Sequence, residues 1–117
     1  MLNQVVLVGR LVRDISVNKA DSGRKVATIC IAIPRSFKNV EGNYDTDFIN
    51  CTAFDQVAIN TGEYCSKGDI IGVKGRLQSR VEVNEKEEKE YFMDVICEKI
   101  TFLSSKQKEE DKEEEHE

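Results

Sequence analysis

The stretch Asp47 to Phe54, DFINCTAF, combines aromatic and small polar residues at a spacing suited to stacking. If it is a β-strand, successive side chains point to opposite faces. The odd positions then form an apolar set suited to a core: Ile49, Cys51 and Ala53. The even positions form the other face: Phe48, Asn50, Thr52 and Phe54. Spaced, exposed rings on a sheet suit the stacking of unpaired nucleic acid bases, because every base offers a π-face. The alternative is that one or both rings pack under a loop or against a second subunit.

A second candidate binding feature is Asp69 to Arg80, DIIGVKGRLQSR, which also alternates. Its inward set is expected to be Ile71, Val73, Gly75 and Leu77. Its outward set is a mostly cationic row: Lys74, Arg76, Gln78 and Arg80. Charges on every second residue of a strand lie roughly 6–7 Å apart, comparable to successive phosphates of a single nucleic acid strand. The alternative is a solvated edge face that charge keeps soluble.

Length and composition predict one domain without a membrane partner. The chain has 117 residues, no apolar run of 18 residues and no basic-then-apolar leader. A cytoplasmic, nucleoid-associated protein is expected. The cysteines are scattered without a CxxC pair, so neither zinc nor a disulfide is expected: Cys30, Cys51, Cys65 and Cys97.

The net charge of −5 argues against a nucleic acid partner until its distribution is considered. Residues 1–81 hold 11 Lys and Arg against 8 Asp and Glu, whereas residues 82–103 and 104–117 each hold 3 against 7. The first two thirds are therefore mildly basic. The acidic residues can lie away from a basic groove.

Five strands are expected along the chain. Val5 to Leu11 is apolar on both faces, which predicts cover on both sides, as in an intersubunit sheet. Residues 15–19 can extend this strand. Val26 to Ile33 follows, with alternate isoleucines on one face, and Pro34 is expected to end it. Residues 35–46 are expected to be a polar connection containing Phe37, and Asp47 to Phe54 is the third strand.

A short helix is predicted from Asp55 to Cys65, with Asp55 as its N-cap and Gly68 closing it. The fourth strand covers residues 69–80, residues 81–90 form an acidic hairpin turn, and residues 91–103 form the last strand. This order predicts an all-β, five-stranded oligonucleotide/oligosaccharide-binding (OB) barrel with one helix between strands three and four. The domain is expected to span residues 1–103, and residues 104–117 are expected to be a disordered acidic tail.

Four blocks of the sequence carry a family resemblance: MLNQVVLVGRLVRD, IPRSFKNVEGNYDTDFINCTAF, EYCSKGDIIGVKGRLQSR and YFMDVICEKITFL. Together they resemble the bacterial single-stranded-DNA-binding proteins over residues 1 to about 103. The resemblance implies an OB-fold homotetramer that binds single-stranded DNA without sequence preference in replication, recombination and repair. It assigns base stacking to Phe37, Phe48 and Phe54.

Phosphate and polar contacts are expected from cations on the predicted groove and from the polar position of the third strand: Arg10, Arg35, Lys38, Asn50, Lys74, Arg76 and Arg80. Binding is expected to be an equilibrium without catalysis, so no cofactor and no catalytic or metal residue is expected. The lone His116 lies in the tail and no carboxylate pair occupies a predicted pocket.

The chain departs from the family in three places. The hairpin after the fourth strand, where a further stacking aromatic is usual, is acidic and has none around Val81 to Val83. Rings that are Trp in many relatives are Phe here, and the chain has no Trp. Housekeeping relatives end in Pro-Phe, which docks replication and repair proteins, whereas this sequence ends Glu115-His116-Glu117. We expect a specialised plasmid, phage or accessory paralogue, or a chain whose terminal motif is missing.

Two other functions fit part of this pattern. An OB module of the primosome type would dock another protein on its aromatic face. A single-stranded RNA binder would use the same stacking and phosphate contacts, because a 2′-OH contact is not readable from sequence.

Overall fold

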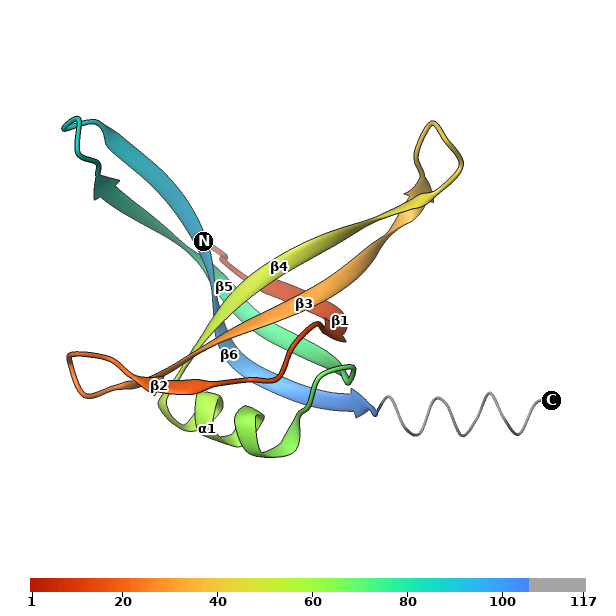
Figure 1. The fold of residues 1–117 in the computed structure, drawn as a ribbon, viewed down its shortest axis with the longest axis horizontal. Coiled ribbons are helices and arrows are strands. Elements are labelled where there is room, and N and C mark those ends of the chain that lie inside the picture. Colours follow the sequence, from red (N-terminus) through yellow and green to blue (C-terminus); the bar gives the residue numbers. More distant parts are fainter. Residues whose placement is uncertain (106–117) are drawn as a thin grey trace.

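The computed structural model describes residues 1–105. In that range the chain forms β1 (Val5–Leu11), β2 (Val17–Lys19), β3 (Lys25–Lys38), β4 (Tyr44–Phe54), α1 (Asp55–Tyr64), β5 (Ile70–Val83) and β6 (Lys89–Ser104) (Figure 1). The strand order is β1-β5-β6-β4-β3-β2, and an additional β1–β3 pairing closes the barrel. β1 and β2 together occupy the place of the first predicted strand. The five-stranded barrel with a helix after its third strand is therefore confirmed.

The barrel interior is filled mainly by branched aliphatic side chains. The largest fully buried ones are Leu11, Ile29, Ile31, Ile71, Val73 and Cys51. All of these except Leu11 belong to the apolar sets predicted from alternation. Leu77 is an exception, because β5 leaves the barrel there and the side chain is 40% exposed. The inward row of the fourth strand is thus shorter than predicted.

All four cysteines are buried free thiols. Cys51 on β4 and Cys97 on β6 share a thiol hydrogen bond, which together with burial raises the pKa of the Cys97 thiol well above its ordinary value. Both thiols belong to the apolar core, so they pack as small hydrophobes. Within residues 1–105, no group of three His, Cys, Asp or Glu side chains is placed to hold a metal ion.

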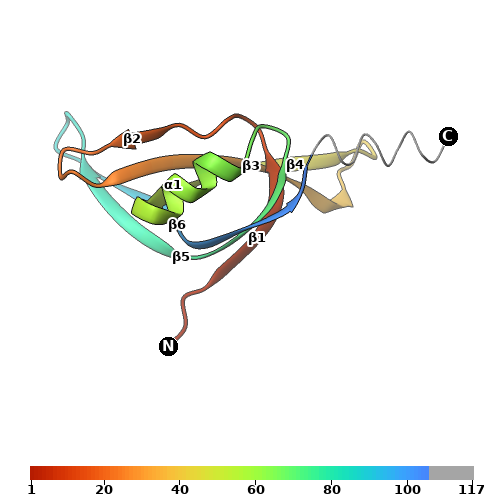
Figure 2. The ribbon, with the colours of Figure 1, turned by 90° about the horizontal axis from the view of Figure 1, so that it is seen from below.

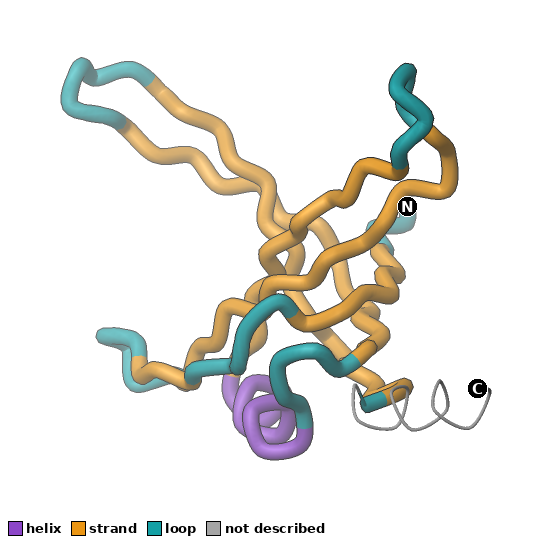
Figure 3. The backbone as a smooth tube through the Cα atoms, turned by 45° about the vertical axis from the view of Figure 1, so that its right-hand side comes forward, coloured by secondary structure: helices purple, strands orange, loops and turns teal. Residues whose placement is uncertain are grey.

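Two hairpin arms project from the barrel, one formed by β3 and β4 and the other by β5 and β6 (Figures 1 and 3). The expected end of a strand at Pro34 is wrong, because β3 continues to Lys38 and Pro34 pairs with Thr46 of β4. Proline is tolerated there because β3 pairs with β1 only at Ile31 and Ala32, which leaves Pro34 on an edge. Most of the predicted polar connection is therefore strand. Half of the acidic hairpin, residues 81–83 and 89–90, is likewise strand, with a turn between Val83 and Lys89.

Both arms end in the same asparagine-based turn. The Asn39 side-chain oxygen accepts hydrogen bonds from the backbone N–H groups of Glu41 and Asn43, at 2.9 and 3.0 Å. Asn84 accepts the equivalent bonds from residues 86 and 88. Such a side chain replaces a backbone turn partner, which is why asparagine favours these positions. Two hairpins of very different charge thus have one turn geometry.

Helix α1 lies across one end of the barrel, on the side away from the two arms (Figure 2). Its buried residues are Ala58 and Thr61. Contrary to the prediction, Asp55 is not the N-cap: it is the first helical residue, and Phe54 is the N-cap without a side-chain cap bond. The helix ends at Tyr64, and Gly68 instead donates its N–H to the Leu11 carbonyl. Within residues 1–105, no helix is both long enough and apolar enough to cross a membrane.

Candidate nucleic-acid interface

The outward face of β4 carries the predicted aromatic set. Cys51 and Ala53 are fully buried, whereas Phe48 is 67% exposed. Phe54 is half-buried and Asn50 is exposed on the same face. The alternation predicted for DFINCTAF is therefore confirmed, and Phe48 offers an open ring.

Strand pairing makes this face of β4 continuous with the outer faces of the neighbouring strands β3, β6 and β5. Thr52 of β4 lies opposite Thr28 of β3 and beside Ile96 of β6. Ile96 in turn lies opposite Arg76 of β5. Residues that are directly paired across strands share a face of the sheet. We call this outer face of β3, β4, β6 and β5 the outer wall.

The cationic row of β5 lies on the outer wall. Lys74, Arg76, Gln78 and Arg80 are exposed. Arg76 donates a hydrogen bond from Nη1 to the Gln78 side-chain oxygen at 2.8 Å. Three of the predicted phosphate ligands are thus on one strand and one face.

Arg80 has carboxylate partners that sequence reasoning did not include. Its Nε lies 3.0 Å from Oδ2 of Asp94 on β6, and its Nη1 is bonded to Glu82. The pKa of the Arg80 guanidinium is raised, chiefly by the hydrogen bond to Asp94. Its Cζ also lies 4.6 Å from the centroid of the Phe92 ring. The carboxylates of Asp94 and Glu82 on this arm therefore neutralise the charge of Arg80.

Phe37 and Lys38 lie on the projecting part of β3, beyond a register shift that follows Pro34. Phe37 is 64% exposed. Lys38 pairs with Tyr44 across the arm, and its Nζ lies 5.7 Å from the centroid of the Tyr44 ring. The β3–β4 arm therefore offers an exposed ring and a cation close to its turn.

Phe54 is covered by a residue that was not predicted. The Arg24 Cζ lies 4.2 Å from the centroid of the Phe54 ring. Asp55 holds this arginine through Oδ2, at 3.1 Å from Nε and 3.0 Å from Nη2. The other carboxylate oxygen of Asp55 accepts the backbone N–H of Lys25 at 3.2 Å.

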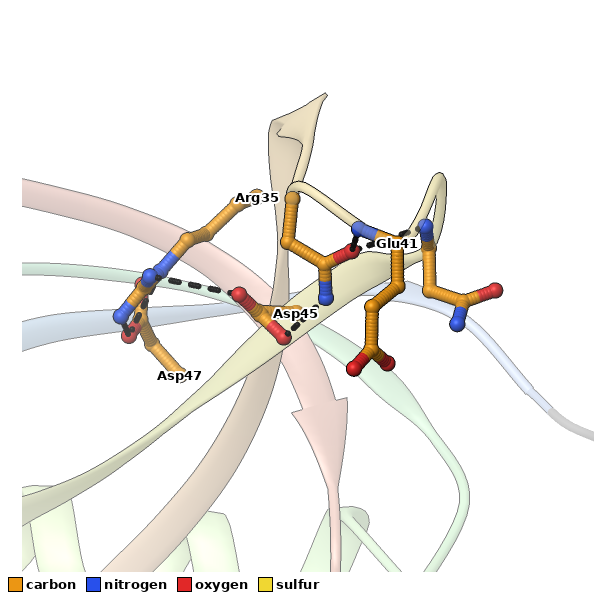
Figure 4. A network of polar contacts seen from close by, with 6 residues as sticks. Arg35, Glu41, Asp45 and Asp47 are labelled. Carbon is orange, nitrogen blue, oxygen red and sulfur yellow. Dashed lines mark hydrogen bonds and ion pairs between the residues drawn. The ribbon is translucent and has the colours of Figure 1, made fainter.

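Arg35 lies on the opposite face of β4 from Phe48. Figure 4 shows it directed at Asp47 and Asp45, with Nη2 of Arg35 2.9 Å from Oδ1 of Asp47. The hydrogen bond from Arg35 holds the pKa of the Asp47 carboxyl below its ordinary value, and the pKa of Arg35 is raised in return. Because Asp47 and Phe48 are sequence neighbours on one strand, their side chains point to opposite faces. The structure does not bring Arg35 together with the outer wall.

Arg10 lies near the aromatic strand by register. It pairs with Ala32 of β3, and Ala32 pairs with Phe48. Its Nη1 also donates to the Gly68 carbonyl at 2.6 Å. Arg10 of β1 therefore lies on the same face of the sheet as Phe48 of β4, with Ala32 of β3 between them.

The chain matches the model of the single-strand binding protein family over residues 2–103. It belongs to this family. It is 44% identical over 106 residues to single-stranded DNA-binding protein 1 of Staphylococcus aureus (strain COL), an alignment that covers 91% of this chain and 64% of that relative. It is 40% identical over 109 residues to single-stranded DNA-binding protein B of Bacillus subtilis (strain 168), with 93% and 96% covered. The chain therefore spans less than two thirds of the staphylococcal relative's length.

For this single-strand binding family member, sequence reasoning missed Arg24, Tyr44 and Phe92. Alternation in YFMDVIC could have placed Phe92, Asp94 and Ile96 on one face. No sequence signal linked that face to the cationic row, because the link depends on the pairing of Phe92 with Arg80. Arg24 precedes β3 in a turn, and only the fold brings it over Phe54.

Proposed function

We propose that this protein binds single-stranded DNA without sequence preference and protects unpaired strands during replication, recombination and repair. The observation that carries the proposal is the open ring of Phe48 on the outer face of β4. Family membership and the printed names of the relatives support it. The expected activity is equilibrium binding without catalysis.

Base stacking explains why unpaired strands would be preferred. An exposed aromatic ring gains about 1–3 kcal/mol from each stacked base, and every base can stack. Duplex bases are already stacked on one another, so Phe48 and Phe37 have nothing to gain from them without melting the duplex.

Phosphate neutralisation would come from exposed cations of β1, β3 and β5. We assign this role to Arg10, Lys38, Lys74 and Arg76, and a weaker one to Arg35, whose charge Asp45 and Asp47 offset. Four neutralised phosphates on a single strand correspond to a salt slope of about −3 in log affinity against log salt concentration. The net charge of the whole chain matters less, because screening confines each charge's effect to about 10 Å at ordinary salt.

Self-assembly is the second part of the proposal. Val6 and Val8 on the outward face of β1 are 67% and 52% exposed in the single chain, although the sequence predicted cover on both faces of this strand. Residues 5–9 of β1 pair with β5 on one side, and the β1–β3 pairing begins only at Arg10. An open strand edge beside apolar side chains favours pairing with a second copy. We propose a homo-oligomer built on β1, with four chains as the family resemblance implies.

Fluorescence anisotropy with labelled oligo-dT, a duplex of equal length and oligo-U tests the DNA-binding part. We expect oligo-dT to bind at least a hundredfold more tightly than the duplex at moderate salt, with affinity falling as salt rises. Equal affinity for oligo-dT and the duplex would contradict the proposal. Tighter binding of oligo-U than of oligo-dT would identify RNA as the ligand instead.

A further inference from the structure

Two arginines on or beside the outer wall each have a guanidinium over an aromatic ring. Arg24 covers Phe54 with its Cζ 4.2 Å from the ring centroid, and Arg80 covers Phe92 at 4.6 Å. The two pairs come from different parts of the fold, one at the end of β4 and one on the β5–β6 arm. The same arrangement has therefore formed twice on one surface.

Each of these arginines is held from its edge by carboxylates. Asp55 accepts from Nε and lies within 3.0 Å of Nη2 of Arg24. Asp94 accepts from Nε and Nη2 of Arg80, while Glu82 accepts from its Nη1. A guanidinium bonded along its edge has little freedom to rotate, so its plane stays fixed over the ring.

The backbone of Asp55, which holds Arg24, has an unusual conformation. Asp55 has φ +50°, in the left-handed region that non-glycine residues rarely adopt. This conformation brings one carboxylate oxygen to the N–H of Lys25 and the other to Arg24. The carboxylate is therefore anchored to β3 while it holds the arginine.

Asp55 occupies the Nε edge of Arg24, and Asp94 and Glu82 bind all three nitrogens of the Arg80 guanidinium, which disfavours phosphate as the ligand of either arginine. A phosphate would have to displace carboxylates that already neutralise the charge, and it would meet Asp55, or Asp94 and Glu82, as like charges. A nucleobase is neutral and needs only the flat face of the guanidinium. Bases stack on arginine planes as they do on aromatic rings.

We propose that Arg24 and Arg80 are base-stacking platforms, each formed by a guanidinium plane backed by a ring and fixed by a carboxylate. This inference deepens the proposed function and rests on it. It assigns a nucleobase, instead of a phosphate, to Arg80. It also gives the acidic β5–β6 arm a share in binding, through Phe92 and Arg80, although no aromatic occupies residues 81–83.

Exchange of arginine for lysine separates the two roles, because lysine keeps the positive charge and loses the plane. Arg24→Lys and Arg80→Lys are compared with Arg13→Lys, a control at an exposed arginine that follows β1 and has no role in the proposed interface. Each variant is titrated with oligo-dT and with an abasic strand of the same length. Thermal unfolding verifies that each is folded, as expected for side chains that are about half exposed.

We expect Arg24→Lys and Arg80→Lys each to lose about five- to tenfold in affinity for oligo-dT, with an unchanged salt slope. Their affinity for the abasic strand should equal that of the unaltered protein, and Arg13→Lys should bind both strands with the affinity of the unaltered protein. Wild-type affinity of the two lysine variants for oligo-dT would overturn the inference. An equal loss on the abasic strand would also overturn it, because that loss does not involve bases.

Failure of this inference is distinguishable from failure of the proposed function. The proposed function is judged on the unaltered protein, by its preference for oligo-dT over duplex. The platforms are judged on the lysine variants relative to that protein. If all three variants bind oligo-dT as tightly as the unaltered protein does, the proposed function is supported and the base-stacking role of Arg24 and Arg80 is contradicted.

Discussion

Phe48 and Asp47 are neighbours on β4, yet they belong to opposite faces and have different partners. Phe48 presents its ring on the outer wall, while Asp47 on the other face binds Arg35. Alternation alone predicted the position of Phe48. It did not predict the ion pair of Arg35 with Asp47, because the partner of a charged residue depends on cross-strand register, which the sequence does not show.

The ion pair of Arg35 with Asp47 predicts a specific acid dependence of stability. Arg35 lowers the folded-state pKa of Asp47 below its ordinary value of 3.8. The stabilisation is therefore fully present above that ordinary value and is lost as pH falls through the lower, folded-state pKa. Arg35→Gln should unfold at a lower urea concentration than the unaltered protein at neutral pH.

At about pH 2 the difference in urea concentration between the two proteins should be smaller than at neutral pH, because Asp47 becomes protonated as pH falls through its lowered pKa. A difference between them that is equal at both pH values would show that Arg35 stabilises the fold through packing. Added salt should also reduce the difference at neutral pH, since the pair is exposed.

At the scale of elements, hydrophobic alternation predicted the barrel strands and their inward faces. It did not predict where the strands end. Pro34 lies within β3, because at that position β3 is an edge strand that needs no N–H from proline. Both hairpin arms form paired strands although their sequences are polar. Asp55 has the composition of an N-cap, but its carboxylate binds Arg24 and Lys25 instead. Such outcomes depend on contacts between residues distant in sequence.

Gly75 shows how closely β5 and β6 approach each other. A Cβ atom added there would lie 2.0 Å from the Ile96 carbonyl oxygen, at a register shift between Lys74 and Gly75. Gly75→Ala should therefore lower the free energy of unfolding by about 2–4 kcal/mol. Urea denaturation followed by circular dichroism measures this loss.

Gly72→Ala on the same strand is the matched control. The nearest atom to its added Cβ is a side-chain carbon of Leu103 at 3.7 Å, an ordinary contact. The change should stay within about 1 kcal/mol. If the two substitutions change the free energy of unfolding equally, the backbone of β6 at Ile96 can move to accept the added methyl group. The close approach of the strands would then not require glycine at residue 75.

At the scale of the whole molecule, the projecting arms and the exposed valines of β1 are unusual for a chain that works alone. The described chain extends 59 Å along its longest axis, and several large apolar side chains outside the outer wall are exposed. Tyr91 and Met93 are examples on the inward face of the β5–β6 arm. A homo-oligomer would bury such surfaces.

Light scattering coupled to size-exclusion chromatography tests this assembly. The unaltered protein should have about four times the 13.3 kDa mass of one chain. Val8→Glu should lower that mass, because it buries a charge at the proposed β1 interface. Gln56→Glu, which adds the same charge on exposed helix surface, should not. A single-chain mass for the unaltered protein would refute assembly while leaving DNA binding to be judged separately.

Stacking of unpaired bases on Phe48 can be tested directly, because this chain contains no tryptophan. Phe48→Trp places one fluorophore on the outer wall, and Tyr64→Trp places one on the exposed end of α1 as a control. Oligo-dT should quench the fluorescence of Phe48→Trp in proportion to binding and leave that of Tyr64→Trp unchanged, and a duplex should quench neither. Tight binding of oligo-dT without quenching of Phe48→Trp would contradict stacking on Phe48.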